Sequence, residues 1–126
     1  KATLSNFKQP PRKVRLLASE LKGKMVSTAL SELDFFGRKA SAPIKKLINS
    51  AVANAEKNLK KDKTNLYIKN IRVDKGTVLK RFRPRAQGRA TTIRHRTSHI
   101  IIELDEKNKV MTQTPQVKIK IKTKKK

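Results

Sequence analysis

Apolar residues recur at helical spacing in three stretches of the first half of the chain. The first stretch has apolar side chains at i, i+3, i+4 and i+7, which predicts a helix over residues 12–22. A shorter pattern predicts a second helix with Val26, Ala29, Leu30 and Leu33 inward, which Phe35-Phe36-Gly37 closes. The third and clearest pattern predicts a helix that Ser41 caps, with Pro43 in its first turn and apolar residues from Ile44 to Leu59 on one face for four turns.

A period-two alternation in the second half of the chain predicts β-strands. Tyr67, Ile71 and Val73 share one parity, which predicts a strand through Val73. Leu66 and Ile68 then fall on the other face of that strand. A second strand is predicted by the apolar positions Ile100, Ile102 and Leu104, and the apolar positions Leu4 and Phe7 are typical of an edge strand or an extended arm.

The segment between the two predicted strands is expected to form one long β-hairpin, over about residues 75–99, with its turn at Gln87-Gly88. With about eleven residues per arm at ~3.3 Å each, it would project roughly 35 Å from the body. Because an isolated two-stranded ribbon is only marginally stable in water, we expect its distal half to be mobile until it binds a partner.

The charge of the chain requires an anionic partner. It has 33 Lys and Arg against 9 Asp and Glu, a formal net charge of +24. Self-repulsion at this charge opposes a compact state, and a phosphate backbone is the strongest available counter-charge. We expect no membrane partner, because the sequence has neither a basic amphipathic helix edged by aromatics, nor an apolar run of about 18 residues, nor a signal-peptide pattern. The absence of Cys excludes disulfides and thiolate metal sites, and fits a reducing compartment.

The positive charge concentrates in residues 75–102, which hold eight Lys or Arg and no acid. Arg81, Arg83 and Arg85 share one face of an extended chain, and Phe82 and Pro84 share the other. The guanidinium fork matches a phosphate, and both Arg and Phe stack on nucleic-acid bases. The pattern therefore predicts an arm that inserts into folded nucleic acid.

Five motifs, in order and spacing, resemble those of the large-subunit ribosomal protein L-twenty-two family in its bacterial and organellar form. Together they cover about residues 10–105. The motifs are Pro11-Arg12-Lys13-Val14-Arg15-Leu16, Ala51-Val52-Ala53-Asn54-Ala55-Glu56, Val73-Asp74, Leu79-Lys80-Arg81-Phe82-Arg83-Pro84-Arg85-Ala86-Gln87-Gly88-Arg89-Ala90 and Arg96-Thr97-Ser98-His99-Ile100.

The resemblance implies an α+β fold, in which three helices pack on a small three-stranded antiparallel sheet with a long, protruding, basic β-hairpin. It implies one domain over residues 1–106 that binds large-subunit ribosomal RNA and supports subunit assembly. The RNA-binding residues carried over or predicted are Lys8, Arg12, Lys13, Arg15, Lys80, Arg81, Phe82, Arg83, Arg85, Arg89, Arg94, Arg96 and His99.

The resemblance also implies that the hairpin tip lines the nascent-peptide exit tunnel near the macrolide site. The implied tip residues are Arg85, Ala86, Gln87, Gly88, Arg89, Ala90, Thr91, Thr92 and Ile93. The expected partners are ribosomal RNA, neighbouring large-subunit proteins and the nascent peptide, with no cofactor and no homo-oligomer. The expected location is the cytoplasmic ribosome of a bacterium or an organellar ribosome.

Two features depart from the family pattern. The family usually reads Val-Asp-Glu-Gly-Pro at the entry to the hairpin, whereas this chain has Val73-Asp74-Lys75-Gly76-Thr77, which predicts a less rigid base that faces RNA. The Lys-rich, basic C-terminal tail over residues 107–126 extends beyond the common end of the family. Its alternating Val117, Ile119 and Ile121 fit either a strand laid on RNA or a solvated disordered tail.

Several residues allow a second interpretation. Phe82 would either stack on a base or pack across the hairpin onto Ile93. Arg12, Lys13 and Arg15 sit at a helix start, where they meet a phosphate or merely keep that face soluble. His95 and His99 stand four apart, but a strand separates them by roughly 13 Å at ~3.3 Å per residue, so no metal site is expected.

Two other classes of function compete with a ribosomal role. A small DNA-architectural dimer also uses basic β-arms, but it needs a large apolar dimer face, and the sequence has no apolar residues to spare for one. An enzyme needs paired carboxylates, an activated nucleophile, a phosphate loop or a metal cluster, and none of these patterns is visible. We therefore predict a non-enzymatic RNA-binding protein.

Overall fold

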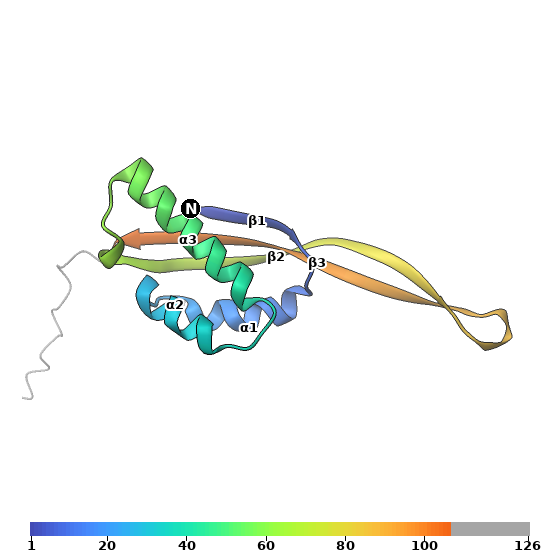
Figure 1. Ribbon diagram of the computed structural model, residues 1–126. Helices are drawn as coiled ribbons and strands as arrows, with labels where there is room; N and C mark the ends of the chain where they lie inside the picture. The colour runs from blue at the N-terminus through green and yellow to red at the C-terminus, as the bar shows by residue number, and fades with distance from the viewer. Residues whose placement is uncertain (107–126) are drawn as a thin grey trace, which may run out of the picture.

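The computed structural model describes residues 1–106 as a three-stranded sheet with α-helices packed against it, and a two-stranded extension that leaves one end (Figure 1). The sheet order is β1-β3-β2, and both neighbouring pairs are antiparallel. The elements are β1 (Ala2–Phe7), α1 (Pro11–Leu21), α2 (Val26–Phe35), α3 (Ser41–Leu59), β2 (Leu66–Pro84) and β3 (Ala90–Glu106), with short 3-10 turns at Lys63–Asn65 and Ala86–Gly88. The predicted α+β class, with three α-helices and a three-stranded antiparallel sheet, is confirmed. The predictions for residues 107–126 lie outside the described residues.

One apolar core lies between the helices and the sheet. Val14, Leu17 and Leu21 of α1 are completely buried, as their helical spacing predicted. Ile100 and Ile102 of β3 face them and are equally buried. Burial of each such side chain stabilises the folded state by about 1.5–3 kcal/mol relative to leaving it exposed to water. This core anchors the base of the two-stranded extension.

The ends of α3 differ from the prediction. Ser41 is the first residue of the helix and does not cap it, because its Oγ donates to the carbonyl of Phe36 at 2.8 Å. Leu59 is 63% exposed, so the packed apolar face ends at Ala55, one turn before the helix does. A left-handed Lys60 (φ 49) then turns the chain away from the helix axis.

The start of β2 shows how apolar residues at both even and odd positions can face the core. Ile68 pairs with Leu104 and Asn70 with Glu103, so Lys69 is an extra residue that forms a β-bulge. The bulge moves the side chains that follow it, as far as the next irregularity at Lys75, to the opposite face. This brings the buried side chains Leu66, Ile68, Ile71 and Val73 onto the core side. The prediction that Leu66 and Ile68 lie on the face opposite Ile71 and Val73 was therefore wrong.

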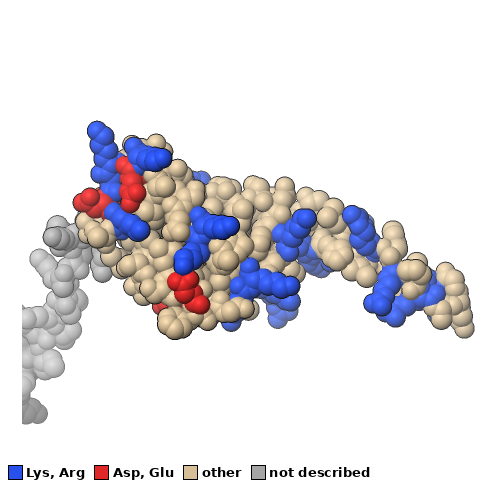
Figure 2. Space-filling view, in the orientation of Figure 1, with Lys and Arg blue, Asp and Glu red and all other residues tan. Residues whose placement is uncertain are grey.

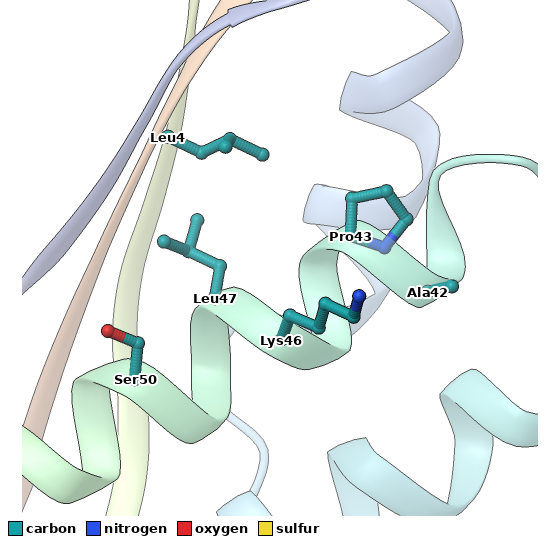
Figure 3. A pocket seen from close by; sticks show the side chains of 6 residues that line it. All are labelled: Leu4, Ala42, Pro43, Lys46, Leu47 and Ser50. Carbon is teal, nitrogen blue, oxygen red and sulfur yellow. The ribbon is translucent and has the colours of Figure 1, made fainter.

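β1 is one of the two edge strands of the sheet, since β3 lies in the centre. Leu4 of β1 and Leu47 of α3 project from opposite sides into a shallow, largely apolar groove of about 320 Å³ (Figure 3). Its lining is completed by Ala42, Pro43, Lys46 and Ser50. β1 therefore joins α3 to β3, and the edge-strand interpretation of the first residues is confirmed.

β2 does not end at Val73 but continues to Pro84 as one strand of a long hairpin with β3. A second irregularity, between Lys75 and Val78, marks the point where the hairpin leaves the body. The turn is at the predicted place, since Gln87 (φ 58) and Gly88 (φ 68) both have left-handed backbones. The N–H of Arg85 donates to the carbonyl of Arg89 at 2.7 Å and closes the turn.

Candidate nucleic-acid interface

The exposed part of the hairpin, residues 79–96, is called the arm below. Every residue in it is exposed, including Leu79 and Phe82. The arm therefore has no core, and its strands are joined by the antiparallel ladder from Val78↔Arg96 to Pro84↔Ala90. Such a ribbon is marginally stable on its own.

The register places cations on both faces of the arm. Opposite residues in an antiparallel pair project to the same side, and successive residues alternate. Arg81 lies opposite Ile93 on one face, whereas Lys80 lies opposite Arg94 on the other. The first face also carries Arg83, and the second also carries Arg96. The arm can therefore meet phosphates on two sides at once.

The register also decides the position of Phe82. Phe82 lies opposite Thr92, and Ile93 lies opposite Arg81 on the other face. The interpretation in which Phe82 packs onto Ile93 was therefore wrong, because the two side chains project to opposite sides. Phe82 is 70% exposed and shares its face with Lys80 and Arg94.

The cations of the arm lack a counter-charge. Within residues 1–106, all six ion pairs lie on the body or at the base of the hairpin, and none includes a residue of the arm. Figure 2 shows Lys and Arg from the underside of the body along the arm, while Asp and Glu gather on the body. Unneutralised charge of this density is typical of a surface that binds a polyanion.

The base of the hairpin and the start of α1 form a second basic feature, called the root groove. It is a groove of about 550 Å³ lined by two prolines and five cations: Pro10, Pro11, Arg12, Arg15, Lys75, Arg94 and Arg96. A smaller hollow continues from it along the hairpin past Val78 and Lys80. The start of α1 has no side-chain cap and no acidic residue in its first turn, so no negative side chain there offsets the positive end of the helix dipole.

Arg15 holds the root groove together. Its Nε and Nη2 atoms donate to the carbonyl of Val73 at 3.1 and 2.9 Å. This fork binds α1 to β2 just before the hairpin leaves the body. Arg15 therefore has a structural role. The other four cations of the groove, Arg12, Lys75, Arg94 and Arg96, form no ion pair within residues 1–106.

Residues 2–105 match the family described as ribosomal protein L22p/L17e. The chain belongs to this family. It is 50% identical over 107 residues to the large ribosomal subunit protein uL22 of Bdellovibrio bacteriovorus, an alignment that covers 85% of this chain and 97% of the relative. The uL22 proteins of Mycoplasma capricolum (50% over 108 residues, 85% and 97% covered) and Lactobacillus helveticus (44% over 108 residues, 86% and 92% covered) are similar in the same way.

Membership of the L22p/L17e family confirms the resemblance read from the five motifs. It also confirms the non-enzymatic prediction, because the family is a structural component of the ribosome. Within residues 1–106, no three His, Cys, Asp or Glu side chains are grouped so that they would hold a metal ion. In the same part of the chain, no helix has the length and apolar character needed to cross a membrane.

The remaining predicted RNA contacts lie in three places. Lys8 and Lys13 are exposed and lie close in sequence to Pro10–Arg12, which line the root groove. Arg85 and Arg89 are exposed at the two ends of the hairpin turn. His99 differs from them, because it is half-buried and its Nδ1 accepts the N–H of Asn6 at 3.2 Å. That hydrogen bond ties β1 to β3, so His99 has a structural role in addition to any contact with RNA.

Lys75 is the residue that the predicted contacts omitted. It lines both the root groove and the hollow beyond it. The available signal was the departure from the L22p/L17e pattern, in which this chain has Lys where the family usually has Glu. That change replaces a negative charge with a positive one in the wall of the groove.

Proposed function

We propose that this protein is a structural constituent of the large ribosomal subunit that binds large-subunit ribosomal RNA through the root groove and the arm. One observation carries the proposal: the arm has no core, has cations on both faces and has no counter-charge within residues 1–106. A ribbon of this kind gains a fixed shape when anions approach it from two sides. Folded RNA supplies phosphates in that arrangement.

The two basic features have different roles in the proposal. Arg81, Arg83 and Arg94 bind phosphates on opposite faces of the arm, which supplies affinity and orientation but little sequence selectivity. Phe82, which is 70% exposed on the same face as Arg94, stacks on a base. The root groove holds a phosphate between the start of α1 and the hairpin, and so fixes the angle at which the arm enters the RNA.

The family resemblance extends the proposal to the tip. Residues 85–93 line the nascent-peptide exit tunnel near the macrolide site, and the nascent peptide is then a transient partner. Neighbouring large-subunit proteins complete the surroundings of the body, with no homo-oligomer. Since the similar uL22 proteins come from bacteria, the proposed location is the cytoplasmic ribosome of a bacterium, with an organellar ribosome as the alternative.

The test is the salt dependence of binding to a large-subunit ribosomal RNA transcript. For six to ten phosphate contacts, the affinity should fall by roughly 10³–10⁵-fold between about 50 and 200 mM salt, by the rule for duplex DNA. The combined variant Arg81→Ala, Arg83→Ala, Arg94→Ala should reduce the slope of log K against log salt concentration by about 2–3.

The matched control removes three positive charges from the body: Lys45→Ala, Lys61→Ala and Lys69→Ala. Each of these lysines forms an ion pair with a carboxylate, so its loss should change the slope much less. Equal slopes for the two triple variants would contradict the proposal, because the effect would then follow net charge alone. Tighter binding to duplex DNA than to the transcript would favour the DNA-architectural alternative.

A further inference from the structure

The end of α2, where the chain enters the loop to α3, carries an aromatic side chain that the fold leaves in water. Phe35, the last residue of α2, is 89% exposed and is the most exposed of the large apolar residues in the described chain. A single exposed apolar residue needs no explanation by itself. The neighbours of Phe35 and the stiffness of the loop are what distinguish it.

The loop is held in one conformation by its own hydrogen bonds. The N–H of Phe36 donates to Glu32 at 3.1 Å, and the carbonyl of Phe36 accepts from the N–H of Arg38 and from the Oγ of Ser41, both at 2.8 Å. Phe36 packs against the core, so the adjacent Phe35 projects outward. A ring presented in this way loses little conformational freedom when it stacks on a partner.

Two basic residues follow the exposed ring closely in the chain, and the guanidinium carbon of the first, Arg38, lies 6.0 Å from the centre of the neighbouring Phe36 ring. Arg38 and Lys39 are exposed, and within residues 1–106 neither forms an ion pair. The nearest acid in sequence, Asp34, is already bound to the ammonium group of Lys45 at 2.6 Å. The α2–α3 loop lies at the same end of the body as the start of α1 and the base of the hairpin (Figure 1).

We infer that this loop is an additional RNA contact, in which Phe35 stacks on an unpaired base and Arg38 and Lys39 bind the flanking phosphates. The inference rests on the proposed function and adds a site that the sequence analysis did not assign. An exposed aromatic ring followed in the chain by two exposed cations without an ion pair in residues 1–106 matches the chemistry of a single-stranded nucleotide, which offers a π-face and a phosphate. The combination suits an apolar protein surface less well, because the cations would be buried without partners.

The first experiment compares Phe35→Ala with Leu59→Ala in binding to a large-subunit ribosomal RNA transcript. Leu59 is also an exposed apolar residue, but it lies at the end of α3 away from the arm (Figure 1). Loss of one base stack should weaken binding of Phe35→Ala by about 5- to 140-fold. Leu59→Ala should bind like the unsubstituted protein, and circular dichroism should show both variants folded.

A second variant reports the stacking directly. The chain has no Trp, so Phe35→Trp introduces a single tryptophan fluorophore. Its emission should be quenched when the transcript is added, whereas the emission of Leu59→Trp should change little. Equal quenching at the two positions, or none at Phe35→Trp, would overturn the inference.

The triple arm variant separates failure of this inference from failure of the proposed function. If the arm variant weakens binding but Phe35→Ala does not, the loop is not an RNA contact, although the arm still is. If neither variant weakens binding, the proposed function itself fails. If Phe35→Ala binds the transcript normally but is incorporated poorly into large subunits, the loop contacts a protein, and the inference is again overturned.

Discussion

Gly76 occupies the one glycine position in the described residues where a methyl group would meet packed atoms. A Cβ placed on Gly76 would lie 2.5 Å from Oγ1 of Thr97, 3.1 Å from Nε2 of His99 and 3.2 Å from the backbone carbon of Thr97. The Oγ1 atom of Thr97 is held in place, since it donates to the carbonyl of Thr77 at 2.8 Å. Gly76→Ala must therefore displace the base of the hairpin or break that hydrogen bond.

The expected cost of Gly76→Ala follows from these contacts. Overpacking of a fixed site costs about 1–3 kcal/mol, and loss of the Thr97–Thr77 hydrogen bond adds about 1 kcal/mol where the clash is relieved in that way. The reduced freedom of the unfolded chain offsets about 0.4–1 kcal/mol of this. We therefore expect a net loss of about 1–3 kcal/mol, or a fall in Tm of roughly 4–8 °C for each kcal/mol.

The assay is thermal and urea unfolding followed by circular dichroism, with Gly37→Ala as the control. No atom of residues 1–106 lies within 4 Å of a Cβ built on Gly37, so this substitution should be neutral or stabilising by up to about 1 kcal/mol. In a Thr97→Ala background, Gly76→Ala should cost less, because the closest contact has been removed. Equal stability of Gly76→Ala and Gly37→Ala would refute the packing argument for the hairpin base.

Three further predictions follow from other contacts. Within residues 1–106 the buried Oγ of Ser98 has no hydrogen-bond partner, so Ser98→Ala should leave the free energy of unfolding unchanged or raise it. Ser41→Ala, which breaks the bond to Phe36, should lower it by about 0.5–1.5 kcal/mol. The reverse order in urea unfolding would be inconsistent with these contacts. The hydrogen bond from Lys69 lowers the pKa of Asp105 below its ordinary 3.8, so this carboxylate stabilises the fold above that pH and loses its effect as the pH falls through the lowered pKa. The difference in the free energy of unfolding between the unsubstituted protein and Asp105→Asn, measured in low salt, should therefore vanish in acid. This difference should be small, because the pair is exposed. Deletion of residues 85–89 should keep the unfolding transition of the body but alter the macrolide response of ribosomes that carry it, and an unchanged response would argue against a tip at the tunnel.

Local patterns in the sequence were sufficient where a single element determines the outcome. The spacing of Val14, Leu17 and Leu21 fixed the buried face of α1, and the left-handed preference of Gly88 fixed the turn. Both properties depend on residues close together in the chain. The same holds for the charge of the arm, which led to the nucleic-acid interpretation without any structure.

Other features of the fold depend on pairing between residues that are distant in the sequence, and local patterns could not predict them. The extra Lys69 in β2 is recognisable only against the register with β3, and it reverses the face of the side chains from Asn70 to Lys75. The same register separates Phe82 from Ile93 and places cations on both sides of the arm. The root groove is lined by both Arg12 and Arg96, which are far apart in the sequence. The motif around either residue does not indicate that the other lies close to it in the fold.

A density map of the large ribosomal subunit that contains this chain would test the two-sided arm most directly. The account predicts RNA phosphates beside Arg81 and Arg83 on one face, and beside Lys80 and Arg94 on the other, with a further phosphate in the root groove. RNA along one face only, or an arm that projects into solvent, would contradict it.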